Sequence, residues 1–173
     1  QLAWSSASQA KQIIPDAQLT PAIGPDTTGL TGSYFANISL AGQPALVRTD
    51  HGVNFNWGNS DPLYSSIPSV WSVRWTGEIE APTTDTYTLT AISCGSVTVS
   101  VGQALVINDA QSHAPEAVSG HIPMIAGKRV PIIINYTSGG SRPEFRLMWA
   151  ASAVSAAVVP ADRLYPLVVD HTA

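Results

Sequence analysis

The stretch "WSVRWTGEIEAPTTDTYTLT", residues 71–90, decides the fold class. Apolar and polar residues alternate one by one in its first part, "WSVRW" (71–75), and again in "YTLTA" (87–91). A strict period of two is the pattern of a β-strand with one buried and one solvated face. Between these runs, "APTTD" (81–85) carries the proline and aspartate typical of a turn. The stretch therefore predicts two strands joined by a turn.

The same alternation recurs towards the C-terminus, in "VTVSV" (97–101) and "FRLMW" (145–149). The nearly all-apolar run "VPIIINY" (130–136) indicates a more deeply buried strand. For "AASAVSAAVV" (150–159) we predict a loop, because its helix-forming residues lack a polar face. Many short strands separated by turn residues predict an all-β fold, an antiparallel β-sandwich or barrel.

The composition limits the partners. Only 12 % of the residues are charged and the net charge is −4, so no basic surface exists to neutralise the phosphates of a nucleic acid. No apolar run approaches the roughly 20 residues of a membrane span, so we expect no membrane insertion. A polar surface built from Ser, Thr, Asn and Gln suits an extracellular protein with neutral polar partners. Cys94 is the only cysteine, which excludes an intrachain disulfide.

The length predicts one domain with flanking segments. Prolines recur at positions 15, 21 and 25, which argues against a long helix or a central strand. We therefore predict a linker or N-terminal arm over residues 1–28, the β-sandwich over 29–167 and a C-terminal tail over 168–173.

Several phrases that follow one another along the chain match one known pattern: "GLTGSYF" (29–35), "RTDHGVNFNWG" (48–58), "SVRWTG" (72–77), "LVIND" (105–109), "AGKRVPIIINY" (126–136) and "LYP" (164–166). Together they resemble the PA-fourteen domain, a family named for a fragment of a toxin's protective antigen. The resemblance covers about residues 29–167. It implies a β-sandwich module of the kind found in secreted glycosidases, toxins and adhesins. In the sugar-binding members, two consecutive aspartates hold a calcium ion that in turn holds sugar hydroxyls.

An alignment without gaps places Cys94 and Gly95 where that family carries its two aspartates. Glycine has no side chain, and a thiol is a poor ligand for a hard cation that prefers six to eight oxygens. We therefore expect no metal site and no calcium at this position, and the calcium-dependent sugar binding of the family does not carry over.

For a neutral glycan we predict contacts from three loops, because an aromatic ring can stack on a sugar while amides and carboxylates bond its hydroxyls. The loop at 94–95 is where the family's lectins place their ligand. The predicted contact residues are Trp57, Asn59, Asp61, Ser93, Cys94, Asn108 and Asp109. The alternative interpretation makes Trp57 part of the core, the asparagines turn formers and Cys94 a small buried hydrophobe.

No catalytic residue is predicted. The four histidines lack a metal-ligand spacing, and Glu78 and Glu80 share a strand face that the pattern places at a solvated edge. We predict a non-catalytic, calcium-independent carbohydrate-binding module of a larger secreted or cell-surface protein. Its partner would be a neutral glycan or polysaccharide, or other domains of the same protein. The alternatives are a structural or protein-interaction module that has lost sugar binding and, last, a small hydrolase.

Overall fold

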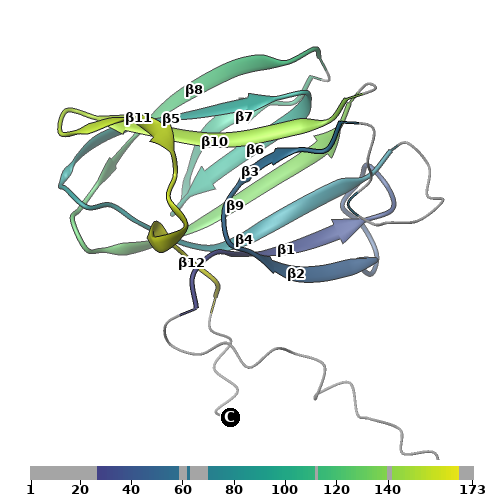
Figure 1. Ribbon diagram of the computed structural model, residues 1–173, viewed down its shortest axis with the longest axis horizontal. Helices are drawn as coiled ribbons and strands as arrows, with labels where there is room; N and C mark the ends of the chain where they lie inside the picture. The colour runs from purple at the N-terminus through teal and green to yellow at the C-terminus, as the bar shows by residue number, and fades with distance from the viewer. Residues whose placement is uncertain (1–26, 59–61, 63–69, 112, 140–141, 168–173) are drawn as a thin grey trace, which may run out of the picture.

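The computed structural model describes residues 27–58, 62, 70–111, 113–139 and 142–167. These residues form two antiparallel β-sheets that pack face to face (Figure 1), and the described part contains no α-helix. The prediction of an all-β antiparallel sandwich is confirmed. The predicted arm (1–28) and tail (168–173) lie almost entirely outside the described residues, so the division into domains stays a prediction.

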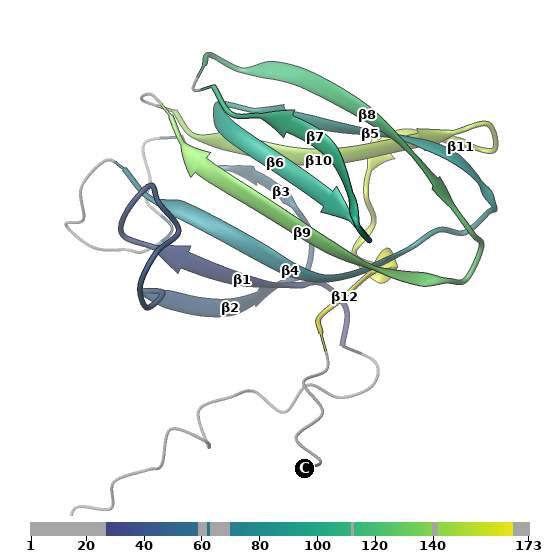
Figure 2. The same cartoon turned by 180° about the vertical axis from the view of Figure 1, so that it is seen from behind.

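The larger sheet has seven strands in the order β2-β1-β4-β9-β6-β7, with β12 also paired to β4. Figure 2 shows this sheet with β7, β6, β9, β4 and β1 side by side. Its strands are β1 (Leu30–Phe35), β2 (Leu46–Asp50), β4 (Ser72–Glu80), β6 (Gly95–Val101), β7 (Ala104–Asp109), β9 (Arg129–Ser138) and β12 (Leu164–Tyr165).

The smaller sheet has five strands in the order β11-β10-β5-β8, with β3 paired to β10. Its strands are β3 (Asn54–Asn56), β5 (Asp85–Ser93), β8 (Glu116–Met124), β10 (Glu144–Ala151) and β11 (Val154–Val158). A single 3-10 turn, Ala161–Arg163, precedes β12.

The two strands predicted from residues 71–90 both form, but they are not partners. β4 belongs to the larger sheet and β5 to the smaller one, so the turn between them carries the chain across the sandwich. The carbonyl of Ala81 in this turn accepts a hydrogen bond of 2.9 Å from the amide of Gly127. An alternating pattern specifies which face of a strand is buried, and it leaves the pairing partner open.

The inward side chains of both sheets make one core, as the alternation predicts. Large aromatic and aliphatic residues of this core are at most 3 % exposed, among them Trp71, Trp75, Tyr87, Val99, Leu147 and Trp149. Burial of each such side chain stabilises the fold by roughly 1.5–3 kcal/mol or more. Most of the aromatic rings lie in contact with one another, for example Trp75 with Phe145 at a centroid distance of 5.3 Å.

Three predictions from the sequence need correction. Residues 150–159 form the end of β10, a turn and the edge strand β11 rather than a loop, with Trp149 opposite Ala157. The missing polar face argued only against a helix, and pairing with β10 satisfies the backbone of these residues as an edge strand. The run 130–136 lies in the central strand β9 but alternates after all: Ile132 and Ile134 are buried, whereas Ile133 is 43 % exposed.

The third correction concerns Glu78 and Glu80, which do not lie at a sheet edge. β4 runs between β1 and β9 in the interior of the larger sheet. Glu80 is 3.4 Å from the guanidinium of Arg129 and 3.2 Å from that of Arg163. These ion pairs join Glu80 to Arg129 on β9 and to Arg163 in the 3-10 turn.

The arginine and the aspartate of the "RTD" phrase (48–50) belong to a largely buried polar cluster. The Tyr34 hydroxyl and the Trp75 indole nitrogen donate hydrogen bonds of 2.6 and 2.8 Å to one oxygen of Asp50. The Arg48 Nε donates to the other oxygen at 2.7 Å. Burial raises the pKa of Tyr34 far above its usual range. Gly32 makes room for the cluster, since a Cβ there would lie 2.6 Å from the Asp50 carboxylate. Every polar group is paired, as a buried charge requires.

Candidate functional site

Three loops meet at one end of the sandwich, the right-hand end in Figure 1: the end of β3, the β5–β6 corner and the β9–β10 connection. Backbone hydrogen bonds of 3.0 Å join them, from the Cys94 amide to the Glu144 carbonyl and from the Trp57 amide to the Pro143 carbonyl. The structure thus brings together the loops of Trp57 and Cys94, which are far apart in the sequence. The β7–β8 loop lies at the same end.

Cys94 is turned into the protein at the β5–β6 corner and is 5 % exposed. Its Sγ donates to the carbonyl of Gly139 at 3.1 Å, and its own carbonyl accepts a hydrogen bond of 2.5 Å from the Tyr136 hydroxyl. Burial, and next the nearby charge of Glu144, raise the pKa of the thiol. The residue is therefore neutral and held in place, as the buried-hydrophobe interpretation predicts.

Gly95 occupies a position that admits no side chain. Its φ of 122° lies in the region that favours glycine, and a Cβ would approach the Thr137 carbonyl to 2.1 Å and the Gly139 amide nitrogen to 2.8 Å. An aspartate therefore does not fit this backbone. The residues at this corner do not suit calcium, and across the described ranges no group of three or more His, Cys, Asp or Glu is arranged to hold a metal ion.

Ser93 lies beside Cys94, is 1 % exposed and points to the core side of β5. Among the described residues its hydroxyl has no hydrogen-bond partner. Such a group lowers stability, because its desolvation is not compensated. Of the predicted contact residues, Ser93 and Cys94 are thus both closed off from the surface.

Asp109 is held by a histidine that the sequence analysis did not single out. The Nε2 of His113 lies 2.5 Å from an Asp109 carboxylate oxygen, and its Nδ1 lies 2.5 Å from the Ala114 carbonyl. The Ala114 carbonyl, followed by the Asp109 side chain, raises the pKa of His113. This pair fixes the start of the β7–β8 loop. The four-residue separation of two polar side chains was the only signal in the sequence.

The side chain of Asn108 points to the opposite side of the sheet from that of Asp109, because neighbouring side chains on a strand face opposite sides. It is exposed on β7 and stands opposite Thr98 on the outer face of the larger sheet.

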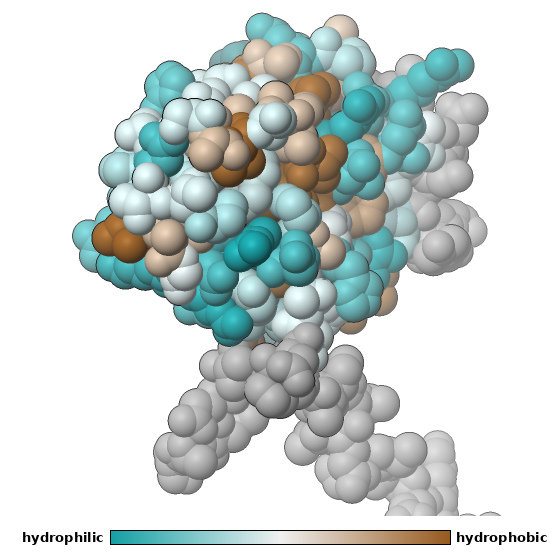
Figure 3. All heavy atoms as spheres, turned by 60° about the vertical axis from the view of Figure 1, so that its left-hand side comes forward, coloured by the Kyte–Doolittle hydropathy of each residue, from teal (hydrophilic) through white to brown (hydrophobic). Residues whose placement is uncertain are grey.

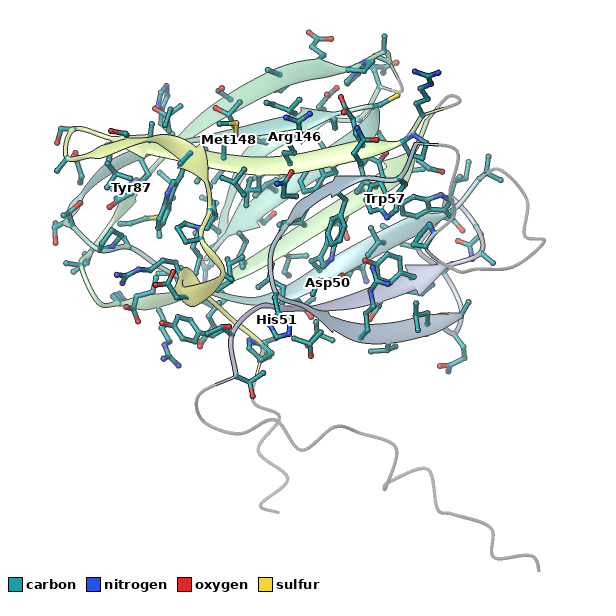
Figure 4. All side chains as sticks on the ribbon, in the orientation of Figure 1. Asp50, His51, Trp57, Tyr87, Arg146 and Met148 are labelled. Carbon is teal, nitrogen blue, oxygen red and sulfur yellow. The ribbon has the colours of Figure 1, made fainter. Side chains whose placement is uncertain are left out.

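Trp57 is half-buried at the end of β3 (Figure 4). Its ring stacks on Phe55 at 5.0 Å with an interplanar angle of 8° and on Tyr136 at 5.6 Å with an angle of 20°. Trp71 meets it edge-on at 4.7 Å. Much of its stacking surface is thus already in use within the protein. Asn59 and Asp61 lie outside the described residues.

An open depression, here called the end cleft, lies next to the Cys94 corner. It has a volume of about 330 Å³ and is lined by Asn56, Gly58, Pro115, Arg142 and Glu144. Glu144 is 3.4 Å from Arg146, which offsets its charge. The cleft offers an amide, a guanidinium and a carboxylate at the surface. These groups pair with hydroxyls, and the set contains no nucleophile with an adjacent base.

Two packed antiparallel sheets with loops that converge at one end define a β-sandwich module. The family model of the PA14 (PA-fourteen) domain matches residues 26–163. The chain therefore belongs to the PA14 domain family, which confirms the resemblance noted from the sequence. No helix within the described residues has the length and apolar character needed to cross a membrane.

Named relatives include the anti-sigma-I factor RsgI3 of Acetivibrio thermocellus, 34 % identical over 169 residues, which are 95 % of this chain and 26 % of the relative. A solved anti-sigma factor domain-containing protein from Clostridium clariflavum is similar with a TM-score of 0.76 at 29 % identity, over 83 % of this chain and 49 % of that one. The PA14 sugar-binding domain of an RTX adhesin shares the fold, with a TM-score of 0.66 at 14 % identity over 82 % and 99 % of the two chains. The chain thus spans a quarter to a half of its anti-sigma factor relatives.

Proposed function

We propose that this PA14 domain is a calcium-independent glycan-binding module that serves a sensing role in a larger secreted or surface-exposed protein of the anti-sigma factor kind. The family, the named relatives and the weakly charged surface support this function. Its ligand would be a neutral glycan or polysaccharide.

The end cleft is the observation that carries the proposal. It lies beside the corner at which the family's lectins place their ligand, and it keeps exposed hydrogen-bonding groups where Cys94 and Gly95 have none. Recognition would then rest on Asn56, Arg142 and Glu144, together with the contacts predicted from the sequence at Trp57, Asn59, Asp61 and Asp109. Loops on a rigid scaffold are where binding residues concentrate.

The expected affinity is low. Without a cation, each neutral hydrogen bond contributes about 0.5–1.5 kcal/mol net. A few such bonds correspond to a dissociation constant in the millimolar to high-micromolar range. Stable retention would require several modules acting together.

The test is a glycan-array screen of the wild-type protein, with calcium and with chelator, followed by titration of variants against the glycans that bind. Arg142→Ala, Asn59→Ala and Asp109→Ala are expected to weaken binding, whereas Asp162→Ala, an exposed control near β12, should not. If all three bind as well as wild type, the loops at this end are not the site. A glycan that binds only with calcium would contradict the calcium-independent mechanism.

Calcium is expected to leave the stability unchanged. A ligand that binds only the native state raises its stability, by about 2.7 kcal/mol at a hundredfold excess over the dissociation constant. Because Cys94 and Gly95 offer no side-chain oxygen to the ion, millimolar calcium should not move the melting temperature measured by scanning calorimetry. A clear upward shift would show that other oxygens bind the ion.

The alternative is a structural or protein-interaction module, which would need a contiguous apolar patch. On the side shown in Figure 3, apolar side chains form only small groups between polar ones. Of the exposed large apolar residues, Leu105 and Ile133 share one row on the larger sheet, whereas Val47 lies in β2, Ile125 in a turn and Leu167 near the end of the described part.

A further inference from the structure

The outer face of the larger sheet carries a row of polar side chains that crosses five strands in register. Ser33 stands opposite Arg74, which stands opposite Asn135. Asn135 in turn is paired with Thr98, and Thr98 with Asn108. With neighbouring strands about 4.8 Å apart, the row is about 19 Å long. It lies on a different surface from the end cleft.

Hydrogen bonds connect the centre of this row. The Arg74 Nε donates to the Asn135 Oδ1 at 2.8 Å, and the Asn135 Nδ2 donates to the Thr98 hydroxyl at 3.2 Å. Side chains held in this way lose little freedom when a ligand binds, which lowers the cost of binding. The row is therefore preorganised.

The middle of the row lies in an open groove of about 250 Å³, here called the face groove. The floor is made of Ser96, Thr98, Asn135 and Thr137, with Leu40 as one wall, and Val97, Asp109 and Ala110 complete the lining at the end of β7. The floor groups are hydroxyls and an amide without formal charge, and the carboxylate of Asp109 is paired with His113. A neutral ligand with many hydroxyls matches these uncharged floor groups. Arg74, the charged member of the row, lies beside Asn135 and outside the lining of the groove.

The loop that carries Leu40 is held in one conformation by hydrogen bonds. Leu40 has a φ of 54°, a conformation that costs a non-glycine residue energy. The loop around it is held by Asn37, whose Oδ1 accepts a hydrogen bond from the Ser39 amide and whose Nδ2 donates to the Ala41 carbonyl, both at 3.0 Å. The Ser72 hydroxyl fixes the loop to the sheet by donating to the Asn37 carbonyl at 2.6 Å.

Apolar groups flank the polar row. Leu40 forms one wall, and on the other side Ile133 and Leu105 stand in the next row, joined through Ser100. They are 43 % and 56 % exposed. A polar strip between apolar edges matches an extended sugar chain, whose rings present hydroxyls at their edges and C–H groups on their faces.

We propose that the face groove is a second binding site, distinct from the end cleft, for an extended segment of neutral polysaccharide. The chain would lie across the strands along the row from Arg74 to Asn108. Its hydroxyls would bond to Asn135, Thr98 and Thr137, and its ring faces would contact Leu40. This site does not depend on binding at the end cleft.

Nuclear magnetic resonance titration of the isotope-labelled full chain tests the proposal. The probes are xylohexaose, cellohexaose and mannohexaose, with hexagalacturonate as the charged comparison. We expect a neutral hexasaccharide to shift the amide signals of Ser96, Thr98 and Thr137 and the side-chain amide of Asn135. Absence of such shifts with all three neutral probes, or stronger binding of the charged one, would overturn the proposal.

A double variant, Thr98→Val with Asn135→Ala, should weaken this binding about tenfold through the loss of two hydrogen bonds. The matched control is Thr90→Val, which removes the same kind of outward hydroxyl from the smaller sheet, where Thr90 bonds to Ser119 at 2.8 Å. Unchanged affinity of the double variant refutes the site.

If Arg142→Ala instead abolishes all shifts, only the end cleft binds: the second site is refuted while the proposed function stands. Shifts that depend on protein concentration without sugar would identify a second copy of the chain as the occupant.

Discussion

The polar groups around Asp50 and those at the Cys94 corner differ in how their hydrogen bonds are satisfied. Around Asp50, three donors from Tyr34, Arg48 and Trp75 surround one buried carboxylate (Figure 4 labels Asp50). At the Cys94 corner the chain is held mainly through backbone carbonyls, and the Ser93 hydroxyl has no partner among the described residues. The first corner is a completed structural cluster. The second is a closed corner, in which Cys94 is buried and Gly95 leaves no room for a side chain.

The comparison teaches that a polar motif does not mark a binding site by itself. The "RTD" phrase carries charged residues, yet it serves stability, because the Asp50 carboxylate is buried and paired with the half-buried Arg48. The Cys94-Gly95 pair looks inert, yet it lies at the end of the molecule where exposed groups of other loops form a cleft. Burial and pairing separate the two roles.

The largest effect should follow Asp50→Ala. Removing this carboxylate leaves the Tyr34 hydroxyl, the Trp75 indole nitrogen and the Arg48 charge without their acceptor. Breaking a buried ion pair in this way costs about 3–5 kcal/mol. Denaturant unfolding measures the loss, with the exposed Asp162→Ala as control. A loss below about 1 kcal/mol would show that Asp50 does not organise the cluster.

Restoring the family's residue by Gly95→Asp should be the next most damaging change. The side chain would meet the Thr137 carbonyl at a φ of 122°. Backbone strain and overpacking each cost about 1–3 kcal/mol, so we expect a loss of about 2–5 kcal/mol without any gain of calcium binding. Gly127→Asp is a control in a turn with nothing within 4 Å of its Cβ, although its φ of 70° carries some strain. Equal losses for both variants would leave the close contact at Gly95 unsupported.

Ser93→Ala should have a small effect of the opposite sign. Replacing a buried hydroxyl without a partner removes an uncompensated desolvation penalty. We expect the free energy of unfolding to rise by up to about 1 kcal/mol. Ser72→Ala is the comparison, because that buried hydroxyl donates to the Asn37 carbonyl and its loss should destabilise the protein. Destabilisation by Ser93→Ala would indicate a hydrogen bond that completes the corner.

The smallest effect concerns the pH dependence of the β7–β8 loop. The pKa of His113 in the folded protein is raised above its ordinary value of 6.5, mainly by the Ala114 carbonyl and the Asp109 carboxylate. Its pairing therefore stabilises the loop fully below that ordinary value and is lost as the pH rises through the folded pKa. Titration of the histidine signals should show this raised pKa, and Asp109→Asn should lower it. An unchanged pKa in the variant would refute the pairing.

The sequence by itself determined β4, β5, β6 and β10 and the buried face of each, since a period of two leaves only one apolar side to a strand. It also determined the PA14 family and the lack of oxygen ligands at Cys94-Gly95. Only the tertiary structure decided that β4 and β5 lie in different sheets, that residues 150–159 pair as an edge, and that Glu80 is held by two arginines. It likewise placed the stacking surface of Trp57 against Phe55 and Tyr136, and it turned Asn108 and Asp109 in different directions. These outcomes depend on contacts between residues distant in the chain, and a local pattern carries no record of its partners.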